Sequence, residues 1–445
     1  MIKQTVRKRP KWLFGLCALA GCADAPATSP EAIGRVEALS ASAQTHAAAG
    51  SGAVTPPVSG VGAGLALPEA KPSRVLTERI GQLTGAPPND YGGLNMSGTD
   101  LGISFPIGDQ LYFLFGDTLI PGWKPYERPD LNLDSIASTS RVRPSGSQAI
   151  PTLRWITKPA EEGGTFQPFV VPDTAPLRQF SVPVEGIHID SRVYLFFHVT
   201  PETVDGSTDD ALRVEKAESV LAHVDADANG TYDFTKIVRD ETIPQDNFRS
   251  VSVVRDGDKF WIYGAATYRR SPVWLARASA ETLAHRSQWA YFSAYDPTLE
   301  DGINTAGAIN PVVADSCVGE LSVRKHPTRD LYFMAYNCGE SIRFRFARHP
   351  AGPWSDAEEL TSNAEVRNSA DNFLGDNSNF LDPQVLTNDE PLGRGALYGP
   401  YMIPEWFTDT AEGNIDIVYT LSSFVPYEIQ LMHSVVSIPS APASN

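Results

Sequence analysis

The chain has 445 residues, with 36 basic and 53 acidic side chains and a formal net charge of −17. A surface this acidic repels phosphate polyanions, which argues against nucleic acid as a partner and leaves neutral or cationic polymers. The length is ample for a large core, and an all-β barrel or propeller of this size can form one domain.

The amino terminus has the pattern of an export signal. Its first eleven residues include five basic side chains, Lys3, Arg7, Lys8, Arg9 and Lys11. The apolar run over 12–19 is too short to span a bilayer and ends at Leu19-Ala20-Gly21-Cys22. We expect a lipoprotein signal peptide over 1–21 and an acylated Cys22. The chain would then be exported and anchored to the bacterial envelope by lipid alone, at the periplasmic face or the outer membrane. The alternative is an ordinary signal peptide in which Cys22 is incidental.

Residues 22–74 are rich in Ala, Gly, Ser and Pro and contain hardly any aromatic residue. Such a segment cannot bury enough apolar area to offset its ordering entropy, so we expect a flexible tether. The folded domain is expected over 75–438, followed by a disordered tail over 439–445.

Beyond Val75 the apolar segments are short and alternating, with Gly, Asp, Asn or Pro at the breaks, which predicts β-strands. Examples are residues 110–115, 192–197, 259–263, 330–336 and 415–421. Turn sequences at 107–109, 256–258 and 327–330 predict hairpins. Sustained helical periodicity is missing, so the fold class is all-β.

A similar strand opening recurs five times, at residues 98–102, 184–187, 249–252, 317–322 and 398–401. A loose repeat of 65 to 85 residues in an all-β chain predicts a single five-bladed β-propeller. The alternative is a pair of β-sandwiches. In a propeller the innermost strands line a central channel, so these openings converge at one mouth.

Two of the four cysteines are accounted for by export, because Cys17 leaves with the signal and Cys22 carries the lipid. Cys317 and Cys338 remain in an oxidising setting, where we expect a disulfide. The alternative is a pair of reduced, buried thiols.

The segment from Asp225 to Asp233 has the oxygen spacing of a calcium loop, with Asp225, Asp227, Asn229 and Asp233 as candidate ligands. Lys236 occupies the place of the usual bidentate glutamate. A weak structural calcium site is one interpretation, and a hairpin turn between two strands is the other. No cofactor is required by the chemistry expected below.

Several segments together carry a family resemblance: residues 98–102 with 111–118, 250–253 with 261–264, 318–322, 352–354, and 398–401 with 426–427 and 430–432. Over nearly all of the folded part the sequence resembles the domain of unknown function 4185 family, members of which form glycoside hydrolase family 183. This resemblance implies a five-bladed propeller. It also implies endo-acting hydrolysis of D-arabinan, the furanose polymer of mycobacterial envelopes.

Glycoside hydrolysis requires two carboxyl groups, one that protonates the leaving oxygen and one that acts as base or nucleophile. The resemblance implies Asp100 and Asp117 as this pair, in an unassigned order. A structural role for Asp100 and a turn-capping role for Asp117 are the alternatives. Glu320 is the third catalytic candidate because its blade opening faces the same channel. Its alternative role is an ion pair with an arginine such as Arg249 or Arg343.

The candidate substrate-binding residues are Glu185, Arg249, Tyr268, Tyr401 and Trp123. Flat aromatic rings can stack on sugar faces, although each alone can also serve packing. The sequence thus predicts a monomeric, membrane-anchored glycoside hydrolase that cleaves a furanose-containing, D-arabinan-like polysaccharide. One alternative is a non-catalytic carbohydrate-binding lipoprotein that uses the same channel. A second is an envelope scaffold that binds protein partners.

Overall fold

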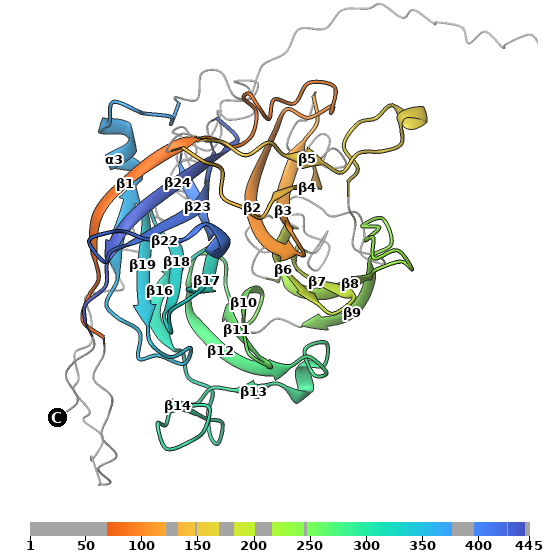
Figure 1. The fold of residues 1–445 in the computed structure, drawn as a ribbon. Helices are drawn as coiled ribbons and strands as arrows, with labels where there is room; N and C mark the ends of the chain where they lie inside the picture. Colours follow the sequence, from red (N-terminus) through yellow and green to blue (C-terminus); the bar gives the residue numbers. More distant parts are fainter. Residues whose placement is uncertain are drawn as a thin grey trace, which may run out of the picture. The chain divides into compact units, whose positions relative to one another are not determined.

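The computed structural model describes residues 69–121, 132–146, 149–168, 182–200, 216–243, 247–375, 396–424 and 426–440. These residues form five antiparallel sheets around a central axis, so the prediction of an all-β, five-bladed propeller is confirmed (Figure 1). The expected signal peptide, the acylated Cys22 and most of the tether lie outside the described residues. Within those ranges no helix is long and apolar enough to cross a bilayer.

The first two blades each contain four consecutive strands. Blade 1 consists of β2 (Gly98–Ile107), β3 (Gln110–Leu119), β4 (Asn132–Ser140) and β5 (Arg154–Trp155). Blade 2 consists of β6 (Val182–Ile189), β7 (Arg192–Val199), β8 (Glu218–Asp225) and β9 (Val238–Ile243). Each strand pairs with the next one in sequence, and the β2–β3 and β6–β7 pairs are hairpins closed by tight turns.

Blades 3 and 4 repeat this order. Blade 3 consists of β10 (Ser250–Asp256), β11 (Lys259–Ala265), β12 (Ser271–Ser279) and β13 (Ala290–Tyr291), and β16 (Val313–Val318) also pairs with β12. Blade 4 consists of β17 (Leu321–Lys325), β18 (Tyr332–Cys338), β19 (Ser341–Ala347) and β20 (Glu358–Ser362). The short strands β14 (Ala294–Tyr295) and β15 (Ile303–Asn304) pair outside the blades, and helix α3 (Asn363–Asn368) follows β20.

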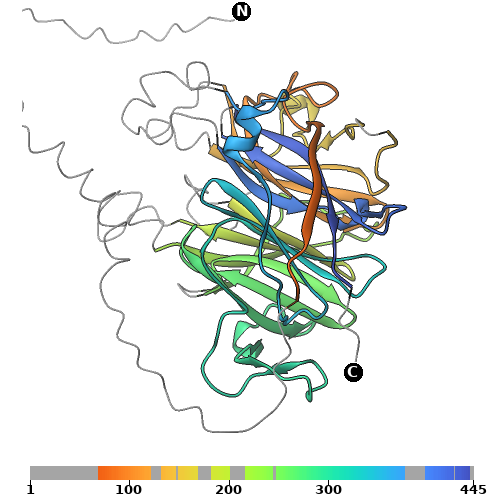
Figure 2. The ribbon, with the colours of Figure 1, turned by 90° about the vertical axis from the view of Figure 1, so that its left-hand side faces the viewer.

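Blade 5 combines the two ends of the domain. It consists of β21 (Leu397–Met402), β23 (Ile415–Ser423), β24 (Glu428–Ser437) and β1 (Ser73–Gln82), with β22 (Thr408–Asp409) beside β23. The outermost strand, β1, pairs antiparallel with β24 from Ser73 opposite Ser437 to Gln82 opposite Gln430. β1 lies beside β24 in both views (Figures 1 and 2). The folded domain therefore begins before the boundary expected at Val75.

The innermost strands β2, β6, β10, β17 and β21 contact one another in that order, and β21 contacts β2, which closes the ring. Between blades the core is built by alternating strand residues. On β3, Phe113 and Phe115 pack toward Val418 and Ile429 of blade 5, whereas Leu114 packs toward blade 2. β3 thus buries apolar side chains on both of its faces, as expected for a strand between two neighbouring blades.

Cys317 and Cys338 form a disulfide between the end of β16 and the end of β18, with 5.0 Å between their Cα atoms. This bond joins the chain segment that enters blade 4 to the second strand of that blade. It lies directly before Glu320, a candidate site residue.

The candidate calcium loop is a turn with an internal β-bridge between Ala226 and Tyr232. Its carboxylates are occupied by protein partners: Asp225 binds Arg192 at 2.7 Å, and Asp233 binds Lys236 at 2.9 Å. The Oδ1 atom of Asp227 accepts backbone N–H groups within the loop. In the described part of the chain no three His, Cys, Asp or Glu side chains are grouped in a way that could hold a metal ion. The loop therefore has the structure of the hairpin turn.

Candidate active site

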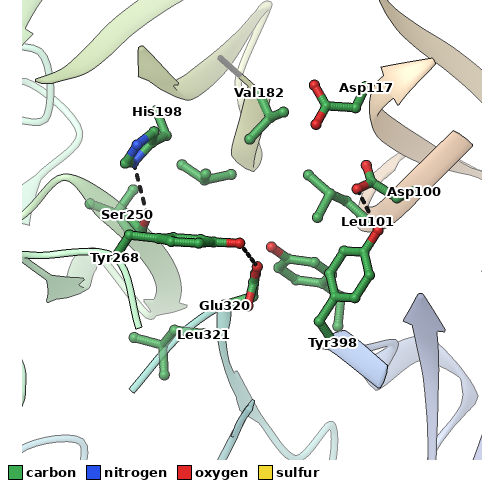
Figure 3. A pocket seen from close by; sticks show the side chains of 13 residues that line it. Asp100, Leu101, Asp117, Val182, His198, Ser250, Tyr268, Glu320, Leu321 and Tyr398 are labelled. Atoms are coloured by element: carbon green, nitrogen blue, oxygen red, sulfur yellow. Dashed lines mark hydrogen bonds between the residues drawn. The ribbon is translucent and has the colours of Figure 1, made fainter. Parts of the chain in front are cut away.

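A cavity of about 150 Å³ lies where the innermost strands begin, and all five blades contribute to it (Figure 3). Its walls are formed by Asp100, Leu101, Asp117, Val182, Val184, His198, Ser250, Val251, Tyr268, Glu320, Leu321, Tyr398 and Tyr401. The convergence of blade openings at one mouth, expected from the sequence, brings Asp100, Asp117, Glu320, Tyr268 and Tyr401 together.

Asp100 is directed by an irregularity in β2. Directly after it, Leu101 and Gly102 have φ values of 68° and 81°, and the pairing register with β3 shifts. The side chain of Ser422 in β23 accepts the N–H of Leu101 at 2.8 Å, and Thr420 donates to the Leu101 and Gly102 carbonyls at 3.1 Å. Blade 5 therefore holds the backbone of blade 1 in the shape that presents Asp100.

The Asp100 carboxyl group is almost completely buried, with 4% of the residue exposed. Its Oδ2 atom accepts hydrogen bonds from the hydroxyls of Tyr398 at 2.8 Å and Tyr427 at 2.7 Å. Its Oδ1 atom is buried without a hydrogen-bond partner. Burial first, and then the charges of Asp117 and Glu320, raise the pKa of Asp100 well above its ordinary value, and the two tyrosines only partly oppose this rise.

Asp117 is presented by a bulge in β3. Phe115 pairs with Ser135 of β4 and Thr118 pairs with Leu133, so Gly116 and Asp117 together face a single residue, Asp134. Such an extra residue bends the strand and re-aims a side chain, a device common next to active sites. Asp117 has a φ of 43° and is half-buried at the cavity wall.

Gly116 lies between the two aspartates. A Cβ atom at this position would lie 3.1 Å from Asp100 Oδ1 and 2.7 Å from a methyl carbon of Leu101. Glycine at this position therefore lets β3 approach Asp100 and Leu101 without displacing their side chains. The Asp100 and Asp117 carboxyl groups lie on the same side of the cavity, with His198 on the other (Figure 3).

Glu320 forms an ion pair with Arg269, as the alternative interpretation expected, although with a different arginine. Its Oε1 atom accepts from Arg269 at 2.9 Å and from the Tyr268 hydroxyl at 2.8 Å. Burial opposes ionisation, but the Arg269 charge and both hydrogen bonds outweigh it and lower the pKa of Glu320. Glu320 is thus a charged group that orients Arg269 and Tyr268, and it fits a binding role better than an acid role.

The aromatic side of the cavity is built around Arg269. Its guanidinium group lies 4.7 Å from the ring centre of Tyr268 and 5.4 Å from that of Tyr398. Tyr268 is 39% exposed, so its ring is accessible from the mouth. Tyr401 also lines the cavity but is 2% exposed and forms part of its wall.

His198 of β7 and Ser250 of β10 form the opposite side, with 3.3 Å between Nδ1 and the hydroxyl. Burial and the charge of Arg249 lower the pKa of His198 to about 4, so the ring is neutral at neutral pH. Arg249 itself is buried and does not line the cavity, which corrects its expected role in substrate binding. Arg249 affects the site through its own charge, which lowers the pKa of His198.

Glu185 does not face this cavity, which is a second correction. A register shift between Pro183 and Glu185 turns its side chain toward a separate cavity of about 420 Å³ lined by the later residues of the inner strands. There its two oxygens accept from Arg324 at 2.8 and 3.1 Å. They also accept from the Ser252 hydroxyl and from the N–H groups of Gly186 and Val253. A carboxylate so fully bonded has a structural role.

Several residues of the site were not expected from the sequence: His198, Arg269, Tyr398, Tyr427 and Asp134. Only the tyrosines left a signal, because both belong to segments that carry the family resemblance. Trp123, the remaining candidate for substrate binding, lies outside the described residues.

Comparisons with known proteins give one family match. The model of the family described as "Domain of unknown function (DUF4185)" matches residues 86–433. No curated protein matches the sequence.

Among solved structures, a presumed hydrolase from Bacteroides ovatus is 13% identical, with a TM-score of 0.48 over 77% of this chain and 86% of the other. A β-xylosidase/α-arabinofuranosidase from a compost microbial metagenome is 12% identical, with a TM-score of 0.39 over 84% and 96%. An arabinanase from Bacillus subtilis is 12% identical, with a TM-score of 0.36 over 77% and 96%.

Proposed function

The chain belongs to the DUF4185 family, and we propose that it is a glycoside hydrolase that cleaves a furanose-containing, D-arabinan-like polysaccharide. One observation carries the proposal: two carboxyl groups, Asp100 and Asp117, line one small cavity in different environments. Acid/base cleavage of a glycosidic bond requires two carboxyl groups whose surroundings give them different pKa values.

The difference between the two environments supports a division of roles. Asp100, whose pKa is raised by burial and by Asp117, acts as the general acid toward the leaving oxygen. Asp117, half-buried on the bulge, supplies the second carboxylate. It acts as base toward a water molecule or as nucleophile toward the anomeric carbon of a sugar bound in the cavity.

The lining of the cavity supports a neutral sugar as substrate. Among the described residues, Asp100, Asp117 and Glu320 line the cavity. The guanidinium group of Arg269 next to them is already paired with Glu320. An acidic sugar would be repelled at such a site. Leu101, Val182 and Leu321 offer an apolar surface, and the exposed ring of Tyr268 can stack on a sugar face.

The proposal includes the location: acylation at Cys22 would hold the enzyme at the envelope, where its polymer substrate lies. Carbohydrate binding without catalysis is the second candidate. The observation that favours it is the burial of Asp100, which is 4% exposed and whose Oδ2 atom accepts hydrogen bonds from two tyrosine hydroxyls.

The test is hydrolysis by the full mature chain in detergent. Reducing-end release and oligosaccharide chromatography are measured with D-arabinan, L-arabinan and neutral envelope polysaccharides, for wild type, Asp100→Asn and Asp117→Asn. Release by wild type that falls in both variants supports the proposal. Equal release by all three proteins would overturn the assignment of the pair. Binding without release on every polymer would favour the second candidate.

A further inference from the structure

Asp134 has a buried carboxyl group. It was not predicted as a site residue from the sequence, and it has no role in the proposed mechanism. It belongs to β4, is 1% exposed, and is the single residue that faces the two-residue bulge at Gly116 and Asp117. Its Oδ1 atom accepts the backbone N–H of Asp117 at 3.1 Å. We propose that Asp134 is the positioning residue of this site, which holds the backbone turn that presents the Asp117 carboxyl to the cavity.

The backbone at Asp117 explains why such an anchor is needed. A φ of 43° is unfavourable for a residue with a side chain and persists only where the surroundings enforce it. In a regular ladder the N–H group of Asp117 would bond to β4 backbone, but the bulge removes that partner. A buried N–H without an acceptor is costly, and Asp134 supplies the acceptor.

An uncharged side chain such as Asn could accept the same hydrogen bond, so the carboxyl at this position has a second consequence. Its Oδ2 atom is buried without a hydrogen-bond partner. Burial and then the charges of Asp117 and Asp100 raise the pKa of Asp134. Asp134 therefore lies in a group of three neighbouring carboxyls, in which a charge on Asp117 or Asp100 raises the pKa of Asp134.

The charged and titratable groups that face this cluster come from every blade opening around it. They are Glu320 with Arg269, the hydroxyls of Tyr268, Tyr398 and Tyr427, and the neutral His198. The nearest cation, Arg269, is paired with Glu320. Burial and the neighbouring carboxylates favour the neutral form of Asp134, and Asn resembles that form in shape and in its acceptor oxygen.

The first test needs no substrate and is independent of the proposed function. Amide hydrogen exchange at residue 117 is measured by NMR in wild type, Asp134→Ala and Asp134→Asn. We expect exchange to become about tenfold faster in Asp134→Ala, because the acceptor is lost, and to stay near the wild-type rate in Asp134→Asn, which keeps an oxygen. Unchanged exchange in Asp134→Ala would overturn the proposal, and so would equal acceleration in both variants.

The second test rests on the proposed function and uses the polymer that wild type cleaves. Asp134→Ala is expected to lower kcat by about 10- to 100-fold with little change in KM, since the reacting carboxyl is misplaced. Asp134→Asn should keep most of kcat, because the amide oxygen can still accept the Asp117 N–H. A loss of kcat in Asp134→Asn as large as that in Asp134→Ala would contradict the positioning role. If wild type cleaves no polymer, the exchange experiment alone decides.

A matched control guards against general destabilisation. Asp416→Asn alters another partly buried aspartate, bonded to Arg143 at 2.8 Å and His433 at 3.0 Å, in blade 5 and outside the cavity lining. It should leave exchange at residue 117 and kcat unchanged. If Asp134→Ala does not fold, Asp134→Leu and Asp134→Asn are compared by the same exchange measurement.

Discussion

The central channel holds buried carboxyl groups at both ends, and their surroundings differ. At one end, Asp100 has an oxygen without a hydrogen-bond partner and lies next to Asp117 and Asp134. At the other end, Glu185 has both oxygens bonded to Arg324 and is further satisfied by Ser252 and two backbone amides. Both residues lie near the start of an inner strand, but Asp100 has other carboxyl groups as neighbours, whereas Glu185 has an arginine.

Burial of a carboxyl group therefore has two different consequences in this protein. A buried carboxylate with a guanidinium partner fixes the arrangement of three blades, because Glu185, Ser252 and Arg324 come from β6, β10 and β17. A buried carboxyl near other carboxyls instead costs stability, and its raised pKa makes it a better proton donor. Substitutions at the two ends should therefore separate activity from stability.

The largest expected effect is at Asp100. Asp100→Asn should lower hydrolysis by about 10²- to 10⁴-fold, because the general acid is lost. It should not lower the free energy of unfolding above neutral pH. Since the folded state binds the Asp100 proton more tightly than the unfolded chain, wild-type stability falls as pH rises above the ordinary pKa of aspartate, and the variant lacks that loss. Urea unfolding between pH 4 and 9 measures this; a variant that is less stable at every pH would contradict the interpretation.

Glu185→Gln should have the opposite effects, a loss of stability without a loss of activity. Loss of one partner leaves the Arg324 charge buried, and the free energy of unfolding should fall by about 3–5 kcal/mol. The rate per folded molecule should stay near that of wild type. The double variant Glu185→Gln with Arg324→Met, which also removes the unpaired charge, should recover part of the stability in urea titrations. A large loss of rate in the folded fraction would assign Glu185 to the reaction after all.

A pair of glycines gives a matched test of packing. Gly116→Ala directs a methyl group toward Asp100 and Leu101, whereas Gly186→Ala directs one onto the Phe105 ring, 2.5 Å from its nearest carbon, at the far end. We expect Gly116→Ala to lower kcat by about tenfold through displacement of the carboxyl. Gly186→Ala should cost about 1–3 kcal/mol of stability with kcat unchanged. Similar effects of both on kcat would argue against a local role for Gly116.

The smallest effect is expected at the tyrosines. Tyr398→Phe or Tyr427→Phe removes one hydrogen bond that favours the charged form of Asp100, so its pKa rises further. The alkaline limb of the pH profile should move to higher pH by about one unit, with the maximal rate retained. A shift of the acidic limb to higher pH, with the alkaline limb unmoved, would mean that Asp100 acts as a base. Tyr332→Phe, whose hydroxyl bonds to Asp256 instead, serves as the control.

The sequence predicts the blades well because each is a local feature: alternating apolar residues and a tight turn define a hairpin without help from the rest of the chain. The five recurring openings correspond to the region of the inner strands. Asp100 and Asp117 were identified through their segment of family resemblance, and the structure brings both to one cavity.

What the sequence could not supply depends on register and on distant partners. A bulge adds one residue to a strand and reverses the faces that follow it, so a one-residue shift is enough to turn Glu185 away from the site. The same effect concealed Asp134, which reads as an ordinary strand residue in Asn132–Ser140. For Glu320, nothing local distinguishes Arg269 from the other arginines considered.

The pairing of β1 with β24 has a consequence for synthesis. Ser73–Gln82 is synthesised well before its partner Glu428–Ser437. Until that partner is made, the first strand has no neighbour to pair with, and an unpaired strand edge invites aggregation. Contacts so distant in sequence also form slowly. A polypeptide that stops before Glu428 contains β1 but lacks β24, so it cannot complete blade 5.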